Sequence, residues 1–181
     1  RGLGDVYKRQ GYLLVNEPLV RSTMEKAKKL GLKVALDLSN FNIVNAFKGM
    51  LEDIIPKYVD ILFSNESEAE AFTGQKAAEA VHTLSELVEV SLVTLGKEGA
   101  LIGSHGQFYS VPAEGGKPVD TTGAGDNFAA GFLYGQSIGA SLVQSARIGS
   151  MLAGYVIDVV GPEIPYDKWE QIKLQVKGIL A

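Results

Sequence analysis

The sequence predicts an α/β fold, an αβα sandwich built on a mostly parallel sheet, and two observations support this. Short apolar runs alternate along the chain with longer stretches whose apolar residues recur at helical spacing. The short runs are apolar throughout rather than at every second position, which is typical of parallel strands buried on both faces. We therefore expect helices on both faces of the sheet.

The expected strands cover 12–15, 33–38, 59–63 and 92–95. The expected helices cover 19–30, 44–55, 66–72, 77–88, 127–138, 142–159 and 166–180. Gly31 is expected to close the first helix, Pro56 to stop the second, and Thr73 with Gly74 to end the third, because glycine and proline interrupt helices. The runs 100–102 and 107–111 predict a hairpin that turns at 104–106 and lies toward one edge of the sheet.

Composition excludes several classes of protein. A chain of 181 residues with 46% hydrophobic and 21% charged residues has ordinary globular composition and can bury one sizeable core. The net charge of −4, without a basic block, argues against nucleic acid as a partner. The absence of cysteine excludes disulfides and thiolate metal sites. The sequence has no membrane-length apolar run and no signal-peptide pattern, so we expect a cytoplasmic protein with no membrane partner.

The most informative segment is Asp120-Thr-Thr-Gly-Ala-Gly-Asp126, which comes directly before an apolar helical pattern. A glycine-rich run at the start of a helix exposes backbone N–H groups at the positive end of the helix dipole, and such groups bind anions. Gly123, Ala124 and Gly125 are the candidates for this role, since glycine also permits close approach of a phosphate. The alternative is a plain helix start with acidic residues and no chemistry.

A carboxylate beside an anion site would repel the anion, so the presence of Asp126 at this position needs a physical explanation. A general base that takes the proton of a hydroxyl as it attacks a phosphoryl group supplies one. Two other glycine loops do not fit. A Walker A loop needs Gly-Lys-Ser/Thr, but the Gly-Lys pairs here are followed by Glu98 and Pro118, and Phe128 stands where a dinucleotide loop needs its third glycine.

The string 120–126, with its continuation Asn-Phe-Ala-Ala-Gly-Phe, resembles the C-terminal signature of the ribokinase-like (phosphofructokinase-B-type) carbohydrate and nucleoside kinases. The resemblance implies a Rossmann-type fold, ATP and Mg²⁺ as cofactors, and transfer of the γ-phosphoryl group to an alcohol. It implies that Asp126 is the catalytic base and that the amides of 123–126 form an anion hole. Asn127 is less usual at its position than a small or aromatic residue.

Two further motifs resemble this family. Asn65-Glu-Ser-Glu68 is similar to its Asn-x-x-Glu motif, in which the glutamate organises magnesium and phosphate largely through water. The alternative is a helix cap, which the same residue types provide. The segment around Thr94, Gly96 and Gly99 is similar to the family's nucleotide-binding Thr-x-Gly-x-x-Gly, and its alternative is an ordinary turn between strands.

Asp120 and Thr122 have two open interpretations. In many family members the equivalent residues, together with carbonyls of a later loop, form a monovalent-cation site that can hold K⁺; here that loop would be 159–162. The alternative is an aspartate that fixes the loop by accepting backbone hydrogen bonds.

The resemblance covers 11–181, which corresponds to the C-terminal part of such a kinase, without the lid and the substrate half. Residues 1–10 show no periodicity, and we interpret them as a non-native leader; the alternative is a real flexible terminus. The stretches 37–44, 58–72 and 149–162 look most similar to bacterial adenosine-kinase-like members, which implies a nucleoside acceptor and leaves a homodimer of the full-length protein open. The alternatives are a free sugar such as ribose or fructose as acceptor, or a non-catalytic nucleotide-binding half-domain.

Overall fold

The computed structural model describes residues 16–115 and 118–181. The chain divides into two compact units. The first unit runs to Leu95 and also takes in Leu101–Tyr109, and the second consists of Gly96–Ala100 and Ser110–Ala181. The leader at 1–10 and the expected strand at 12–15 lie outside the described residues.

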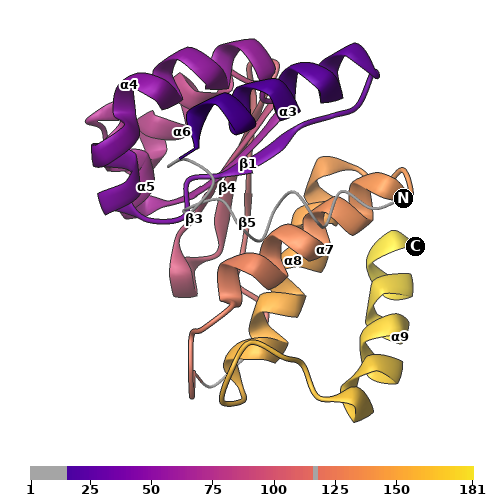
Figure 1. The fold of residues 1–181 in the computed structure, drawn as a ribbon. Coiled ribbons are helices and arrows are strands. Elements are labelled where there is room, and N and C mark those ends of the chain that lie inside the picture. Colours follow the sequence, from indigo (N-terminus) through magenta and orange to yellow (C-terminus); the bar gives the residue numbers. More distant parts are fainter. Residues whose placement is uncertain (1–15, 116–117) are drawn as a thin grey trace. The chain divides into compact units, whose positions relative to one another are not determined.

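Five strands form one sheet in the order β1-β2-β3-β4-β5 (Figure 1). Their bounds are β1 Ala35–Asp37, β2 Ile61–Asn65, β3 Val90–Thr94, β4 Ala100–Ser104 and β5 Gln107–Val111. The pairs β1–β2 and β2–β3 are parallel, with Leu36 opposite Leu62 and Asn65 opposite Thr94. The predicted, mostly parallel α/β fold is therefore confirmed.

The hairpin between β4 and β5 is also confirmed. His105 and Gly106 both have positive φ angles, 48° and 75°, as the two central residues of a tight hairpin turn require. A non-glycine residue adopts this conformation at some cost, and Gly106 reduces the cost of the turn.

The helices of the first unit are α3 Glu17–Lys29, α4 Phe41–Tyr58, α5 Glu66–Thr73 and α6 Ala77–Ser85. They share one apolar core with alternate strand residues, among them Leu36, Leu62 and Val93. Gly74 ends α5 in the left-handed conformation, as predicted. Adjacent residues Leu62 and Phe63 are both buried, which fits a strand with two covered faces.

Two predicted helix ends are wrong. Pro56 does not stop α4, which continues to Tyr58. A proline in the last turn removes one backbone bond, while Ile54 and Ile55 beside it are fully buried and hold the turn in place. The α6 helix ends at Ser85 rather than at 88, and the chain then closes in a turn in which the Leu87 N–H donates to the Leu84 carbonyl.

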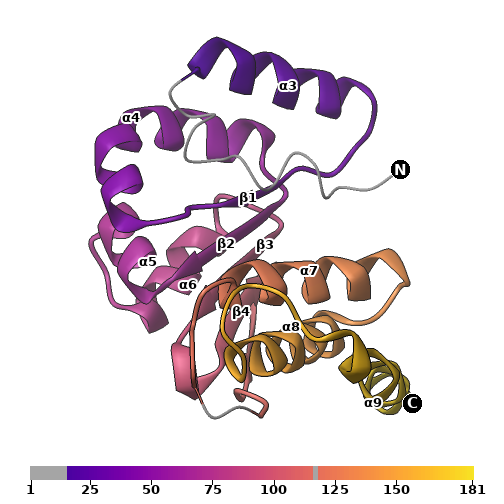
Figure 2. The ribbon, with the colours of Figure 1, turned by 60° about the horizontal axis from the view of Figure 1, so that its bottom comes forward.

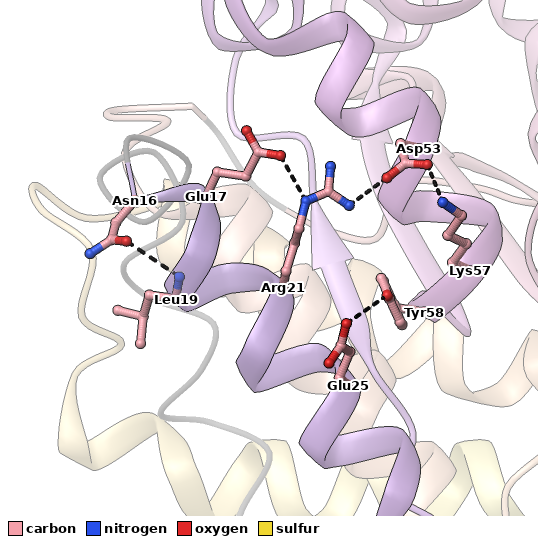
Figure 3. Close-up of polar contacts among 8 residues, drawn as sticks. All are labelled: Asn16, Glu17, Leu19, Arg21, Glu25, Asp53, Lys57 and Tyr58. Carbon is pink, nitrogen blue, oxygen red and sulfur yellow. Dashed lines mark hydrogen bonds and ion pairs between the residues drawn. The ribbon is translucent and has the colours of Figure 1, made fainter.

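Ion pairs connect α3 and α4 on their exposed side (Figure 3). Arg21 donates to Glu17 within α3 at 2.7 Å and to Asp53 in α4, and Lys57 pairs with the same Asp53. Two hydrogen bonds lower the pKa of the Asp53 carboxyl, and the one from Lys57 has a larger effect than the one from Arg21. Such exposed pairs fix the register of two helices more than they stabilise the fold.

The second unit contains α7 Ala124–Ser137, α8 Leu142–Ile157, the short 3₁₀ turn η2 Tyr166–Lys168 and α9 Trp169–Leu180. The α7 and α8 helices lie side by side in both ribbon views (Figures 1 and 2). Their contact is a seam of small residues: a Cβ added to Gly131 would lie 2.7 Å from the Gly149 Cα. The α8 and α9 helices share a smaller apolar cluster that includes Ile148 and Ile172.

Candidate functional site

The start of α7 is an uncapped helix end. Gly123 is the N-cap, with φ of 79° in the left-handed region, and no side chain accepts a hydrogen bond from the first turn. The Ala124 N–H donates to the Thr121 carbonyl at 3.2 Å, which leaves the next two amides, of Gly125 and Asp126, facing outward at the positive end of the helix dipole. This is the local geometry that the sequence motif predicts.

Gly123 and Gly125 occupy different environments. A Cβ added to Gly123 would lie 2.8 Å from the Pro162 Cβ, and its positive φ disfavours any side chain. Gly125 has an ordinary helical conformation, and a Cβ added there would meet nothing within 4 Å. The fold therefore requires glycine at 123 but not at 125.

Asp126 lies in the first turn of α7 and is exposed. Its side chain makes no hydrogen bond or ion pair with any residue in 16–115 or 118–181. A free carboxylate next to outward-facing amides can accept a proton from a bound hydroxyl.

Asp120 joins the turn to the loop after α8. One of its oxygens accepts the Thr122 N–H and the other accepts the Gly161 N–H, each at 2.9 Å. These bonds, the one from Gly161 first, lower the pKa of the Asp120 carboxyl. The observed contacts are those of a loop-fixing aspartate; the role of Asp120 and Thr122 in binding a cation stays a prediction.

Asn65 and Glu68 form a complete capping box at the start of α5. The Glu68 oxygens accept the Asn65 N–H at 2.8 Å and the Asn65 Nδ2 at 2.6 Å, and the Asn65 Oδ1 accepts the Glu68 N–H at 3.0 Å. Glu68 is only 4% exposed, and this burial raises the pKa of its carboxyl against the opposing effect of the Asn65 bonds. The structure thus shows the helix cap, and the role of Glu68 in organising magnesium stays a prediction.

Thr94 ends β3 opposite Asn65 at the end of β2, so the first unit brings these two predicted residues together. The carboxyl ends of parallel strands are where ligands of open sheets bind. Gly96 and Gly99 follow Thr94, in the second unit. A Cβ on Gly99 would fall on the Val111 carbonyl oxygen, so the fold itself requires glycine there. Gly96 has open space around its Cα, but its positive φ of 55° disfavours a side chain.

The sequence did not predict that segment 112–115 packs against α8. Ser150 of α8 donates to the Pro112 carbonyl at 2.8 Å and accepts the Glu114 N–H at 3.0 Å, while Arg147 pairs with the Glu114 carboxylate. The Glu114 carbonyl rests on Gly154, where a Cβ would collide with it. The small residues Ser150 and Gly154, four apart on one helix face, are the only signal in the sequence.

A half-open cavity of about 380 Å³ adjoins the contact between segment 112–115 and α8, within the second unit. Its lining includes Glu114, together with Met151 and Tyr155 of α8 and with Lys168 and Gln171 of the C-terminal segment. No sequence motif pointed to it, because its residues come from three separate stretches of the chain.

Within 16–115 and 118–181, no helix is long and apolar enough to cross a membrane. No three acidic or imidazole side chains in the same ranges lie together as a metal site.

The chain resembles known proteins over most of its length. The family model described as pfkB family carbohydrate kinase matches residues 6–169. An adenosine kinase of Saccharomyces cerevisiae is 32% identical over 171 residues, which cover 87% of this chain and 50% of that protein. An adenosine kinase of Sinorhizobium meliloti, known as a crystal structure, is 31% identical with a TM-score of 0.84, covering 91% of this chain and 52% of that one.

A probable sugar kinase of Rhizobium etli gives a TM-score of 0.85 at 31% identity, over 93% of this chain and 52% of the other. The chain thus spans about half the length of the relatives that it matches. The family model covers far more than half of the chain, including the turn at 120–126. The chain belongs to the pfkB family of carbohydrate kinases.

Proposed function

We propose that this chain is the C-terminal part of an ATP-dependent kinase that phosphorylates a hydroxyl of a nucleoside, adenosine or a close analogue. The observation that carries the proposal is the exposed Asp126 carboxylate in the first turn of α7, beside the outward-facing amides of that turn. The similarity to two adenosine kinases supports the choice of a nucleoside.

The reaction that we propose at the start of α7 is transfer of the γ-phosphoryl group of ATP to the acceptor hydroxyl. The acceptor oxygen forms a bond to the γ-phosphorus, its proton passes to an Asp126 carboxylate oxygen, and the bond to the bridging oxygen breaks with its electron pair leaving on ADP. The outward-facing amides of Gly125 and Asp126 stabilise the negative charge of the transferred group. Asp126 has no competing partner among the described residues, so its carboxylate is available to accept the proton.

We assign Asn65, Thr94, Gly96 and Gly99 to the nucleotide, as the family resemblance implies. Magnesium, bound with ATP, would neutralise phosphate charge. Glu68 would act on it through water, because each of its oxygens already accepts one hydrogen bond and has a further lone pair. For Asp120 we favour the loop-fixing role, since both of its oxygens accept backbone amides.

The test of the catalytic assignment uses a chimera in which residues 16–181 replace the matching half of the Sinorhizobium meliloti adenosine kinase. Asp126→Asn should lower kcat by about 10²–10⁴-fold and leave ATP affinity nearly unchanged, because a base acts in the transition state. Asp167→Asn, at an exposed acid of η2, is the matched control and should keep activity. Near-normal turnover of Asp126→Asn in an active chimera would refute the assignment.

The acceptor needs a separate test, because the chimera takes its substrate half from the other kinase. A full-length kinase that combines this chain with its own substrate half should prefer adenosine over ribose and fructose in kcat/KM. A preference of about tenfold or more for either sugar, worth roughly 1.4 kcal/mol of transition-state free energy, would replace the nucleoside with a sugar and keep the kinase.

A further inference from the structure

Asn127 has a side chain that joins two segments far apart in the sequence. Its Nδ2 donates to the Gly123 carbonyl at 2.9 Å and to the Pro162 carbonyl at 3.3 Å. Both hydrogens of the amide are therefore used, one on the turn that begins α7 and one on the loop after α8.

The Gly161–Pro162 loop is held by residues on both sides of the turn that begins α7. Asp120, before the glycines, accepts the Gly161 N–H, and Asn127, after them, donates to the Pro162 carbonyl. Between these bonds, Pro162 packs against Gly123 so closely that a Cβ on the glycine would lie 2.8 Å from the proline Cβ. The loop therefore covers Gly123, whose left-handed backbone sets the direction of the Gly125 and Asp126 amides.

The two bonds of Asn127 have different consequences. The bond to Gly123 is local, from one residue to the carbonyl four positions earlier, and a small hydroxyl side chain could replace it. The bond to Pro162 spans 35 residues, and only a side chain that reaches the loop can make it. Nothing in the helix itself requires this second bond.

We propose that Asn127 is a positioning residue for the anion-binding turn: by tying the Gly161–Pro162 loop to Gly123, it holds the amides of Gly125 and Asp126 in the orientation that receives a phosphate. This proposal rests on the proposed function of the turn. Asn127 itself touches neither the phosphate nor the acceptor, and it acts through the backbone of Gly123 and Pro162.

Three variants of the 181-residue chain separate the two bonds. Asn127→Ala removes both, and Asn127→Ser keeps a donor for the Gly123 carbonyl while losing the reach to Pro162. Gln136→Ala is the matched control on the same helix, because Gln136 also uses its amide on two acceptors, the Ala140 carbonyl at 3.2 Å and the Ser145 Oγ at 2.8 Å.

Two readouts by NMR on the ¹⁵N-labelled chain test the tie and its effect. The first is the amide order parameter of Gly161, which should fall from about 0.85 toward 0.6 or below when the loop is released. The second is the Kd for inorganic tripolyphosphate, followed at the amides of Gly125 and Asp126. A lost hydrogen bond of ordinary strength corresponds to a Kd that rises about fivefold.

We expect Asn127→Ala and Asn127→Ser to loosen Gly161 and weaken tripolyphosphate binding alike, while Gln136→Ala changes neither. If Asn127→Ser behaves as the parent chain, or if both variants keep full affinity, Asn127 is only a local helix contact and the proposal is wrong. If the parent chain shows no shift with tripolyphosphate, the anion site itself fails and the positioning role falls with it. The order parameter of Gly161 still reports in that case whether Asn127 ties the loop.

Discussion

Gly123 and Gly125 lie two positions apart in the same turn, yet the structure disfavours a side chain only at the first. Gly123→Ala places a Cβ against Pro162 at a positive φ, so we expect a loss of about 1–3 kcal/mol in the free energy of unfolding. Gly125→Ala meets nothing within 4 Å and should gain about 0.5–1 kcal/mol from helix propensity. Urea denaturation of the two variants measures the difference.

The same pair separates stability from ligand binding. If a phosphate approaches Gly125, the more stable Gly125→Ala variant should bind tripolyphosphate more weakly than the parent chain, because the methyl group occupies the space in front of the amides. A stabilised variant with unchanged affinity would show that the phosphate does not come close to residue 125.

Glu68 should make stability depend on pH in a definite direction. Burial raises the pKa of the Glu68 carboxyl above its unfolded value, so the folded chain holds this proton more tightly than the unfolded chain. The stabilising effect is fully present below the unfolded pKa, about 4.3, and is lost as pH rises through the folded pKa. Glu68→Gln should therefore gain stability relative to the parent chain between pH 4 and pH 7.5.

Asp120→Asn provides a control of opposite sign. Bonds from Gly161 and Thr122 lower the pKa of Asp120, so its contribution is present above the unfolded pKa and lost as pH falls. Thermal unfolding of both variants and the parent chain from about pH 2 to pH 7.5 measures the two slopes, because the effect of Asp120 is lost only below its unfolded pKa of about 3.9 and that of Glu68 only above about 4.3. Equal slopes for all three chains would show that neither carboxyl differs between the folded and unfolded states.

The residues of the turn were predictable, and their partners were not. Asp126, Gly123 and Gly125 stand in a contiguous motif that fixes them at a helix start. The bond from Asn127 to Pro162 joins residues 35 apart, and no local pattern encodes it. Glu68 satisfied both a capping and a metal-organising interpretation, because both use a carboxylate three residues after an asparagine.

At the scale of elements, the α7–α8 seam depends on glycine. A Cβ on Gly131 would lie 2.7 Å from the Gly149 Cα, and one on Gly149 would lie 2.5 Å from the Phe128 carbonyl oxygen. We expect Gly131→Ala to force the helices apart and cost about 1–3 kcal/mol or more. Differential scanning calorimetry of the chain should show a lowered Tm.

Gly178→Ala is the control for this seam. Gly178 lies inside α9 with nothing within 4 Å of an added Cβ, so the same substitution should raise stability by about 0.5–1 kcal/mol through helix propensity. Similar effects at 131 and 178 would mean that the two helices can separate without cost.

Most elements followed from periodicity, and the errors have a common cause. Apolar runs and glycine stops placed β2, α5 and the β4–β5 hairpin close to where they are found. The end of α4 was missed because the sequence shows a proline but not the burial of Ile54 and Ile55 next to it. Tertiary packing outweighed the local signal there.

Within the described residues, the sheet has two edge strands, β1 and β5. In the strand order, β1 is terminal and pairs only with β2 among the strands of 16–115 and 118–181. Homologous kinases are about twice as long as this chain. Sequence reasoning recovered this relationship from the motifs alone, but it could not place the two units relative to each other, because no local pattern carries that information.

The 181-residue chain by itself should not transfer a phosphoryl group to an acceptor. Phosphoryl transfer needs the acceptor hydroxyl held within about 3 Å of its base and in line with the γ-phosphate, and positioning supplies most of the rate. The chain matches only half of each related kinase, so we expect it to release no ADP above background with adenosine, inosine, ribose or fructose. The chimera with the Sinorhizobium meliloti enzyme, assayed in parallel, should turn over because it restores the other half. ADP release by the purified chain that is lost in Asp126→Asn would show instead that these residues alone position an acceptor.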